Sequence, residues 1–252
     1  GMILKDKSGA TILDEDFSIV VEEYKEFQKK QNIETDNSFS INLNELNGRF
    51  DYDFYSPENR KMIFVLEDKN AKRLCEVADI IKVKSKKLNQ SDKSVEYVEL
   101  SDINTHSFEI INTTSYLVHE LPSRASYELK TGDIITAVAG NSVGTQKHAT
   151  ALVTEEFEGC ICTNGFRVLR NFKIDHYYLL YFLKSESFLK QMYMYRTGAA
   201  IPNVSDYDLA NILINIPSEK TIKQIGEKMK KAFGLRQESR KQIESINFEL
   251  VT

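Results

Sequence analysis

Between Ala71 and Pro217 the apolar residues fall into short runs, and this feature limits the fold more than any other. Each run is four to nine residues long, and Gly, Asn, Ser or Asp separates it from the next. Runs of this length and spacing are typical of β-strands joined by turns. The runs are YVEL at 97–100, FEII at 108–111, DIITAVAG at 133–140, ATALVT at 149–154 and ICTNGFRVL at 161–169.

One helical pattern interrupts these strands. Residues 175–196 carry apolar side chains at helical spacing, which predicts one long helix. A parallel sheet of β–α–β units would need more helices than the sequence offers. We therefore predict an α+β fold, with a mainly antiparallel sheet domain over residues 71–217.

A second helical pattern fills residues 218–252. Apolar residues step by three and four along the segment, as in the seam of a coiled coil, and Arg236 and Ser239 interrupt it. Such a stripe can pack on the chain's own body or on a partner helix, and we expect a dimerisation or partner helix. The seam residues are Ile222, Ile225, Met229, Ile243, Ile246 and Leu250.

Residues 1–70 have a different character. Residues 13–31 place aromatic and aliphatic side chains on one helical stripe, and Pro57 after Ser56 is a typical helix start. We interpret this part as a helical N-terminal or linking segment.

Charge does not point to a nucleic-acid partner. The net charge is -4, and residues 1–60 hold 13 acidic residues against 7 basic ones. The middle of the chain is close to neutral, so only a local basic face could attract DNA.

Cysteine usage favours a reducing compartment. Cys75, Cys160 and Cys162 are odd in number and follow no disulfide or metal-binding pattern. The N-terminal residues include no apolar signal sequence, and no apolar run is long enough to span a membrane. We expect a cytoplasmic protein.

Catalytic signatures are missing from the sequence. It has no phosphate-binding GxxxxGK[ST] loop, no HExxH, no GxGxxG and no Asn-Pro-Pro-aromatic tetrapeptide. Asp51 and Asp53 flank Tyr52, which favours a solvated acidic face over a hydrolytic site. We expect no catalytic residue, no metal and no cofactor. The scattered histidines are His106, His119, His148 and His176.

Three polar segments could contact DNA, since amide and hydroxyl groups read base edges and cations bind phosphate. Each also suits a plain turn or connector. The first is the loop after residue 140, the second links the long helix to the next helical turn, and the third is a basic cluster. Their residues are Asn141, Ser142, Thr145, Gln146, Lys147 and His148; Arg196, Thr197 and Asn203; and Arg167 and Lys173.

Four segments in this order resemble the target-recognition domain of type I restriction-modification specificity subunits. They are GDIITAVAGNSVG, ICTNGFRVLR, YLLYFLKSESFLKQMYMYRTGAAIPNVSDYDLANILINIP and SEKTIKQIGEKMKKAF. The likeness runs from about residue 71 to 245, and GRFDYDFYSPENRKM upstream is similar to the family's lead-in. The family's Pro-x-x-Glu-Gln at the start of the last helix is here Pro217-Ser218-Glu219-Lys220-Thr221.

The resemblance implies a recognition module. Such a domain reads one half of a bipartite target in double-stranded DNA, and Arg124 joins the expected contact residues. The last helix would pair with a second recognition half or a second copy of the chain. An adenine DNA methyltransferase subunit and a motor-nuclease restriction subunit would complete the complex.

A full specificity subunit has two such domains, and this chain has one. The chain is therefore a half-subunit, part of a longer subunit or the end of a fused methyltransferase. GATILDEDFSIVVEEYKEFQ is similar to the C-terminal end of an N-6 adenine methyltransferase subunit, which favours the last two. The rival interpretation is a protein-interaction scaffold that docks through the seam helix and does not read DNA.

Overall fold

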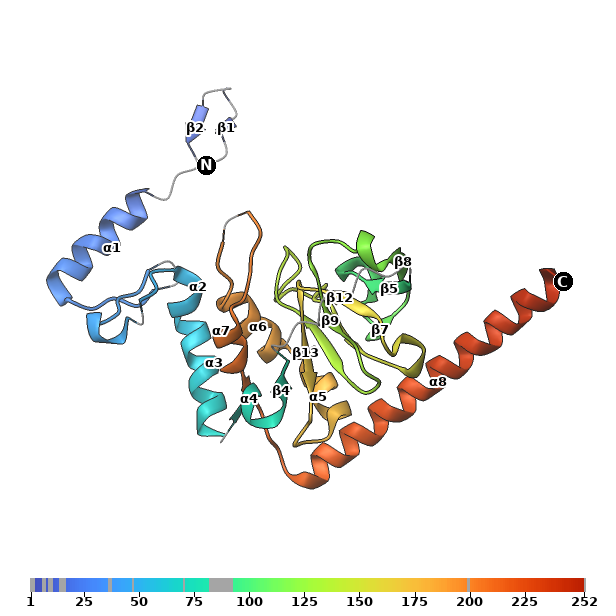
Figure 1. The fold of residues 1–252 in the computed structure, drawn as a ribbon. Coiled ribbons are helices and arrows are strands. Elements are labelled where there is room, and N and C mark those ends of the chain that lie inside the picture. The colour runs from blue at the N-terminus through green and yellow to red at the C-terminus, as the bar shows by residue number, and fades with distance from the viewer. Residues whose placement is uncertain are drawn as a thin grey trace. The chain divides into compact units, whose positions relative to one another are not determined.

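The chain folds into two compact units, residues 1–61 and 62–252 (Figure 1). The structure is a computed structural model that describes residues 3–5, 8, 11–13, 17–35, 38–46, 48–69, 71–81, 93–198 and 200–251.

The first unit is mainly helical, as predicted for this part of the chain. The stripe within residues 13–31 forms α1, and the helix that starts at Pro57 forms α3, which continues into the second unit. Its elements are β1 (Ile3–Lys5), β2 (Thr11–Leu13), α1 (Phe17–Lys30), the 3-10 turn η1 (Leu43–Glu45), α2 (Tyr52–Tyr55) and α3 (Pro57–Asp68).

Two four-stranded sheets form the body of the second unit. The strand orders are β11-β10-β13-β4 and β8-β5-β12-β9, and every pairing except the parallel β5–β12 pair is antiparallel. The predicted α+β fold with a mainly antiparallel sheet is therefore confirmed. The strands are β4 (Asp79–Ile80), β5 (Ser94–Val98), β8 (Thr114–Leu117), β9 (Ala125–Glu128), β10 (Ile134–Ala137), β11 (Thr150–Leu152), β12 (Ile161–Thr163) and β13 (Phe166–Arg170).

Smaller elements complete the unit. Two further antiparallel pairs join β14 to β3 and β6 to β7. The elements are β3 (Lys72–Arg73), β6 (Ile103–Asn104), β7 (Glu109–Ile110), β14 (Leu213–Ile214), α4 (Leu74–Val77), α5 (His176–Phe182), α6 (Glu186–Met194), α7 (Asp206–Ala210), α8 (Glu219–Val251), η2 (Leu100–Asp102), η3 (Val118–Glu120) and η4 (Glu155–Phe157).

The single long helix predicted over residues 175–196 is wrong in one respect, because it is split into α5 and α6. Ser185 lies between them, and its side chain accepts a hydrogen bond from the backbone N–H of Phe188 at 3.2 Å. A serine in this position caps a new helix more effectively than it continues an old one.

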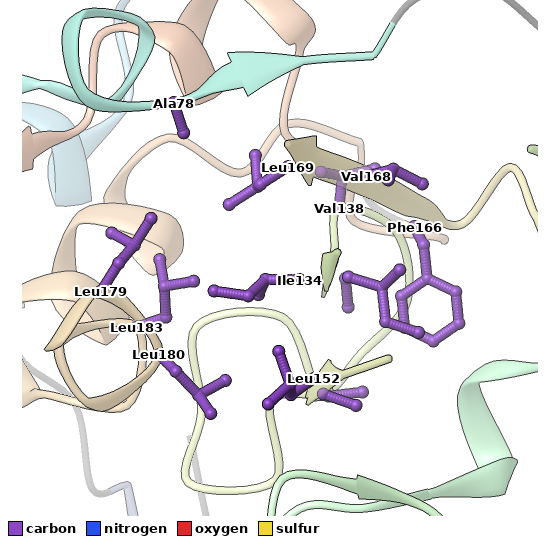
Figure 2. Close-up of a cluster of buried hydrophobic side chains, with 14 of the residues drawn as sticks. Ala78, Ile134, Val138, Leu152, Phe166, Val168, Leu169, Leu179, Leu180 and Leu183 are labelled. Carbon is purple, nitrogen blue, oxygen red and sulfur yellow. The ribbon is translucent and has the colours of Figure 1, made fainter. Parts of the chain in front are cut away.

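The core lies between β10, β13 and helix α5. All four residues of β10 are buried, and Figure 2 shows Ile134 and Leu169 facing Leu179 of α5 and Leu183, which follows the helix directly. Removing one such leucine side chain would cost about 2–5 kcal/mol. This packing fixes β10 and β13 against the helix.

The N-terminal half of α8 packs onto the same body. Met229 packs against the core cluster, and Phe233 is buried within it. Gly226 lies where a Cβ atom would come within 2.4 Å of the Asp175 carboxylate, which caps α5. A larger residue at this position would have to displace the Asp175 side chain from its capping position.

A buried ion pair ties the start of β10 to the end of β13. The Asp133 carboxylate accepts from Arg170 Nε at 2.7 Å and from Arg170 Nη2 at 2.6 Å, and it also accepts from the backbone N–H of Lys130 at 2.8 Å. Gly132 supplies the positive φ of 88° that the turn needs. Gly-Asp at this point is thus explained by turn geometry and by pairing with Arg170.

We predict that Asp133→Ala lowers the free energy of unfolding by about 3 kcal/mol or more, because Arg170 then keeps a partly buried charge without a partner. Glu186→Ala removes an exposed ion pair with Lys190 and should cost under about 1 kcal/mol. Urea unfolding of both variants measures the difference. Equal costs would show that the Asp133 pair is no more important than a surface pair.

Candidate nucleic-acid interface

Two loops that are far apart in sequence lie side by side beyond the end of β10. The backbone N–H of Gly140 donates to the Pro202 carbonyl at 2.9 Å, and that of Val204 donates to the Val138 carbonyl at 2.8 Å. An isolated antiparallel bridge joins Ala139 to Asn203. The loop after residue 140 and the connector after Arg196 therefore form one structure.

Close backbone approach also holds the first loop against α6. A Cβ atom on Gly144 would lie 2.4 Å from the backbone nitrogen of Tyr193, and the φ of Gly144 is 74°. A larger residue could not occupy this position without moving the loop or the helix. Gly144 is thus the point at which the first loop packs against α6.

A third turn joins the other two. The backbone N–H of Val138 donates to the Gly165 carbonyl at 2.8 Å, and that of Asn164 donates to the Arg124 carbonyl at 2.7 Å. These bonds gather segments from four parts of the chain at one end of the sheets. We use the name loop face for the surface that these segments form, and its exposed polar residues include Arg124, Asn141, Gln146, Lys147, Asn164, Thr197 and Asn203.

Four of these residues are amides with unused hydrogen-bonding capacity. Among the described residues, the side chains of Asn141, Gln146, Asn164 and Asn203 make no recorded hydrogen bond, and all four residues are exposed. Each has donor and acceptor groups available to a ligand. Asn164 was not among the predicted contacts. The Asn-Gly pair that forms the β12–β13 turn could have indicated that it is exposed.

The arginines near the loop face are held by neighbours. Arg124 pairs with Glu99 at 2.8 Å, and Arg167 pairs with Asp206 at 2.5 Å. The guanidinium carbon of Arg196 lies 3.5 Å from the centre of the Tyr193 ring, and its Nη1 is 3.4 Å from the Val143 carbonyl oxygen. Acidic and aromatic partners therefore offset much of the local positive charge.

Arg167 is committed further to the fold. Its Nη1 donates to the carbonyls of Asn164 at 2.8 Å and Phe166 at 2.9 Å. These bonds brace the β12–β13 turn from within. The guanidinium thus supports the loop face, and the residue is half-buried.

Polar contacts within the first loop keep its middle folded. Thr145 Oγ1 donates to the Ser142 carbonyl at 2.8 Å, and the backbone N–H of Lys147 donates to Thr145 Oγ1 at 3.2 Å. Ser142 and Thr145 are half-buried, whereas Lys147 is exposed.

His148 is buried beneath this loop. Its Nδ1 accepts from the backbone N–H of Gly144 at 3.1 Å, so Nε2 carries the proton and donates to Thr136 Oγ1 at 2.9 Å. Burial, and to a smaller extent the nearby Lys184 ammonium, lowers the pKa of His148 to about 3. A neutral histidine therefore links the loop to β10, and its ring does not reach the surface.

Lys184 supports the same loop and was not predicted. Its ammonium donates to the carbonyls of Gln146 at 3.2 Å and His148 at 2.9 Å. Partial burial lowers the pKa of Lys184. The sequence around Lys184 does not indicate that it supports this loop, because the two segments are distant in sequence and meet only in the folded chain.

Lys173 lies apart from the other predicted contacts. It follows the far end of β13, and its backbone N–H donates to the Val77 carbonyl at 2.8 Å. The loop face lies at the opposite end of β13, beside Phe166. The exposed Lys173 side chain is thus separated from the loop face by the length of the strand.

The predicted seam of α8 has two distinct halves. Ile222, Ile225 and Met229 are half-buried, and Met229 packs against the chain's own core. Ile243 and Ile246 are 58% and 55% exposed, and Leu235 is 56% exposed. The side chain of Leu250 lies outside the described residues. Within the described residues, the C-terminal half of the stripe is therefore the more exposed part.

Neither a metal site nor a membrane span is found in the described part of the chain. No group of three or more His, Cys, Asp or Glu side chains there could hold a metal ion. None of the helices in that part combines the length and apolar character needed to cross a membrane.

The family follows from comparison with known proteins. The family model of the type I restriction modification DNA specificity domain matches residues 66–246. The match covers most of the chain, so the chain belongs to this family. No curated protein matches the chain.

Solved structures agree with this assignment. The chain resembles the HsdS subunit from Thermoanaerobacter tengcongensis, with 25% identity, a TM-score of 0.54, and coverage of 71% of this chain and 46% of that one. A chain from a type I restriction-modification system, studied for its complex assembly and conformational transition, has the same identity and coverage and a TM-score of 0.55. The present chain spans less than half the length of either.

The buried His148 makes stability depend on pH. The unfolded chain binds a proton at this residue as the pH falls below about 6.5, whereas the folded chain does not until about pH 3. The stability that the neutral His148 ring contributes to the folded chain is therefore fully present above pH 6.5 and is lost as the pH falls. We predict a loss of about 2 kcal/mol from this group between pH 7.5 and pH 5.

Urea unfolding of His148→Gln at both pH values tests this effect. Between pH 7.5 and pH 5, the free energy of unfolding should fall by about 2 kcal/mol less in the variant than in the unmodified chain. His106→Gln, at an exposed histidine, should keep the full drop. An unchanged loss in His148→Gln would mean that His148 takes up a proton as readily in the folded chain as in the unfolded chain.

Proposed function

We propose that this chain reads one half-site of a DNA target, as one recognition half of a type I restriction-modification specificity subunit. The loop face is the observation that carries the proposal. Segments separated in sequence are hydrogen-bonded together there, and they present exposed amides that have no partner within the described residues. Family membership supports the same conclusion.

The chemistry of these side chains suits base recognition. An Asn or Gln amide can bind the N6 and N7 groups of adenine in the major groove, and an exposed lysine can bind phosphate. Arg124 and Arg196 can exchange their present partners for DNA. The proposed contact set is Arg124, Asn141, Ser142, Thr145, Gln146, Lys147, Asn164, Arg196, Thr197 and Asn203.

Three residues predicted as contacts are left out of this set. His148 is buried, and Arg167 is held beneath the β12–β13 turn. Lys173 lies at the far end of β13. The first two support the loop face from below.

The remaining functions belong to an assembly. The exposed half of α8 would pair with a second recognition half or a second copy of the chain, which sets the spacing of the half-sites. An adenine methyltransferase subunit would flip and methylate the target base, because a stacked base cannot be methylated. A motor-nuclease subunit would cut. We propose no catalytic role for this chain.

Selection from a random duplex library with the full chain tests the proposal. We expect enrichment of one short motif a few base pairs long, and binding that weakens steeply as salt rises. The scaffold interpretation predicts no enrichment and no binding to any duplex at low salt. That outcome would overturn DNA reading and favour docking through α8 alone.

Lysine variants separate the loop face from the rest of the surface. Lys147→Ala should weaken binding to all sequences, and the slope of log affinity against log salt should become shallower by about one. Lys173→Ala is the matched control and should change neither. If Lys173→Ala weakened binding more than Lys147→Ala, the DNA would lie at the Arg170 end of β13, which would contradict this proposal.

A further inference from the structure

The connector after α6 is a tightly closed hairpin. The backbone N–H of Thr197 donates to the Asn203 carbonyl at 2.9 Å, and that of Asn203 donates to the Thr197 carbonyl at 2.8 Å. Gly198, with a φ of 92°, lies where a Cβ atom would be 3.0 Å from the Ile201 carbonyl oxygen. Gly198 and Ile201 therefore lie close together across the hairpin.

The base of the hairpin is anchored to the body. Gly140 donates to the Pro202 carbonyl, and the buried Val204 donates to the Val138 carbonyl at the end of β10. Figure 1 shows the two limbs of the hairpin extending beyond α6 and α7. The backbone thus carries the tip outward from a fixed position.

An apolar side chain stands at this tip. Ile201 is 69% exposed, and it lies two residues from Asn203, whose exposed amide has no recorded partner among the described residues. The exposed residues named above for the loop face all have polar or charged side chains. If this polar face reads DNA, an exposed apolar side chain on it would contact an apolar group of the DNA.

The 5-methyl group of thymine is that group. It is the one apolar feature that base pairs present in the major groove, which is wide enough for a two-stranded ribbon. We propose that the Thr197–Asn203 hairpin enters the major groove and that Ile201 contacts the methyl group of a thymine. The half-site would then contain a required A·T pair. This inference deepens the proposed function and rests on it.

Replacing thymine by uracil removes the methyl group and keeps the base pairing. In the selected duplex, each thymine is replaced in turn, and the affinity of the full chain is measured. One position should show a loss of about fourfold, the value expected for burying one methyl group. Ile201→Ser should bind thymine and uracil at that position equally.

Ile111→Ser is the matched control, since Ile111 is 56% exposed and lies at the end of β7. It should keep the fourfold preference. No thymine preference at any position, or one that persists in Ile201→Ser, would overturn this inference and leave DNA reading intact. Equal weakening of both duplexes by Ile201→Ser would also overturn it, because such a loss indicates insertion between bases. Failure of the unmodified chain to bind any duplex would instead refute the proposed function.

Discussion

The rest of the second unit depends on the hydrogen bonding of β10 and the residues that follow it. Both edges of the strand are paired, and all four residues are buried. Beyond its end, the backbone of Val138 and Gly140 bonds to Gly165, Pro202 and Val204. Buried peptide groups must find partners, so the chain cannot leave this strand without fixing a turn and a hairpin beside it. The backbone sets the loop positions, and the exposed side chains are free to vary without loss of the fold.

The same arrangement explains why net charge alone gives no indication of the proposed DNA binding. Arg124 and Arg167 are paired with carboxylates, and Arg196 lies over an aromatic ring. The partners of Arg124 and Arg196 are partly exposed, so each contact contributes little to stability and can be exchanged at small cost, whereas Arg167 stays bound beneath the β12–β13 turn. A face of this kind depends on amides and shape more than on net charge. Its affinity as a single half would gain from linkage to a second half.

Much of the fold could be predicted from the sequence, because short apolar runs and helix starts are local signals. The break at Ser185 could not, since the apolar spacing continues across it and only the cap distinguishes two helices from one. The loop face was predicted as separate segments. Their meeting, the support from Lys184 and the burial of His148 arise from contacts between residues distant in sequence. The spacing of the α8 seam likewise did not show which part packs on the chain itself: Met229 lies against the core, whereas Ile243 and Ile246 are exposed.

The central claim is that the loop face is the surface that reads DNA. Hydrogen–deuterium exchange of the full chain, with and without its selected duplex, tests this most directly. Because bound DNA shields exposed backbone amides, exchange should slow in residues 140–147 and 197–203 and stay unchanged around Lys173. Protection confined to α8 or to the N-terminal unit, with these loops unaffected, would contradict the account.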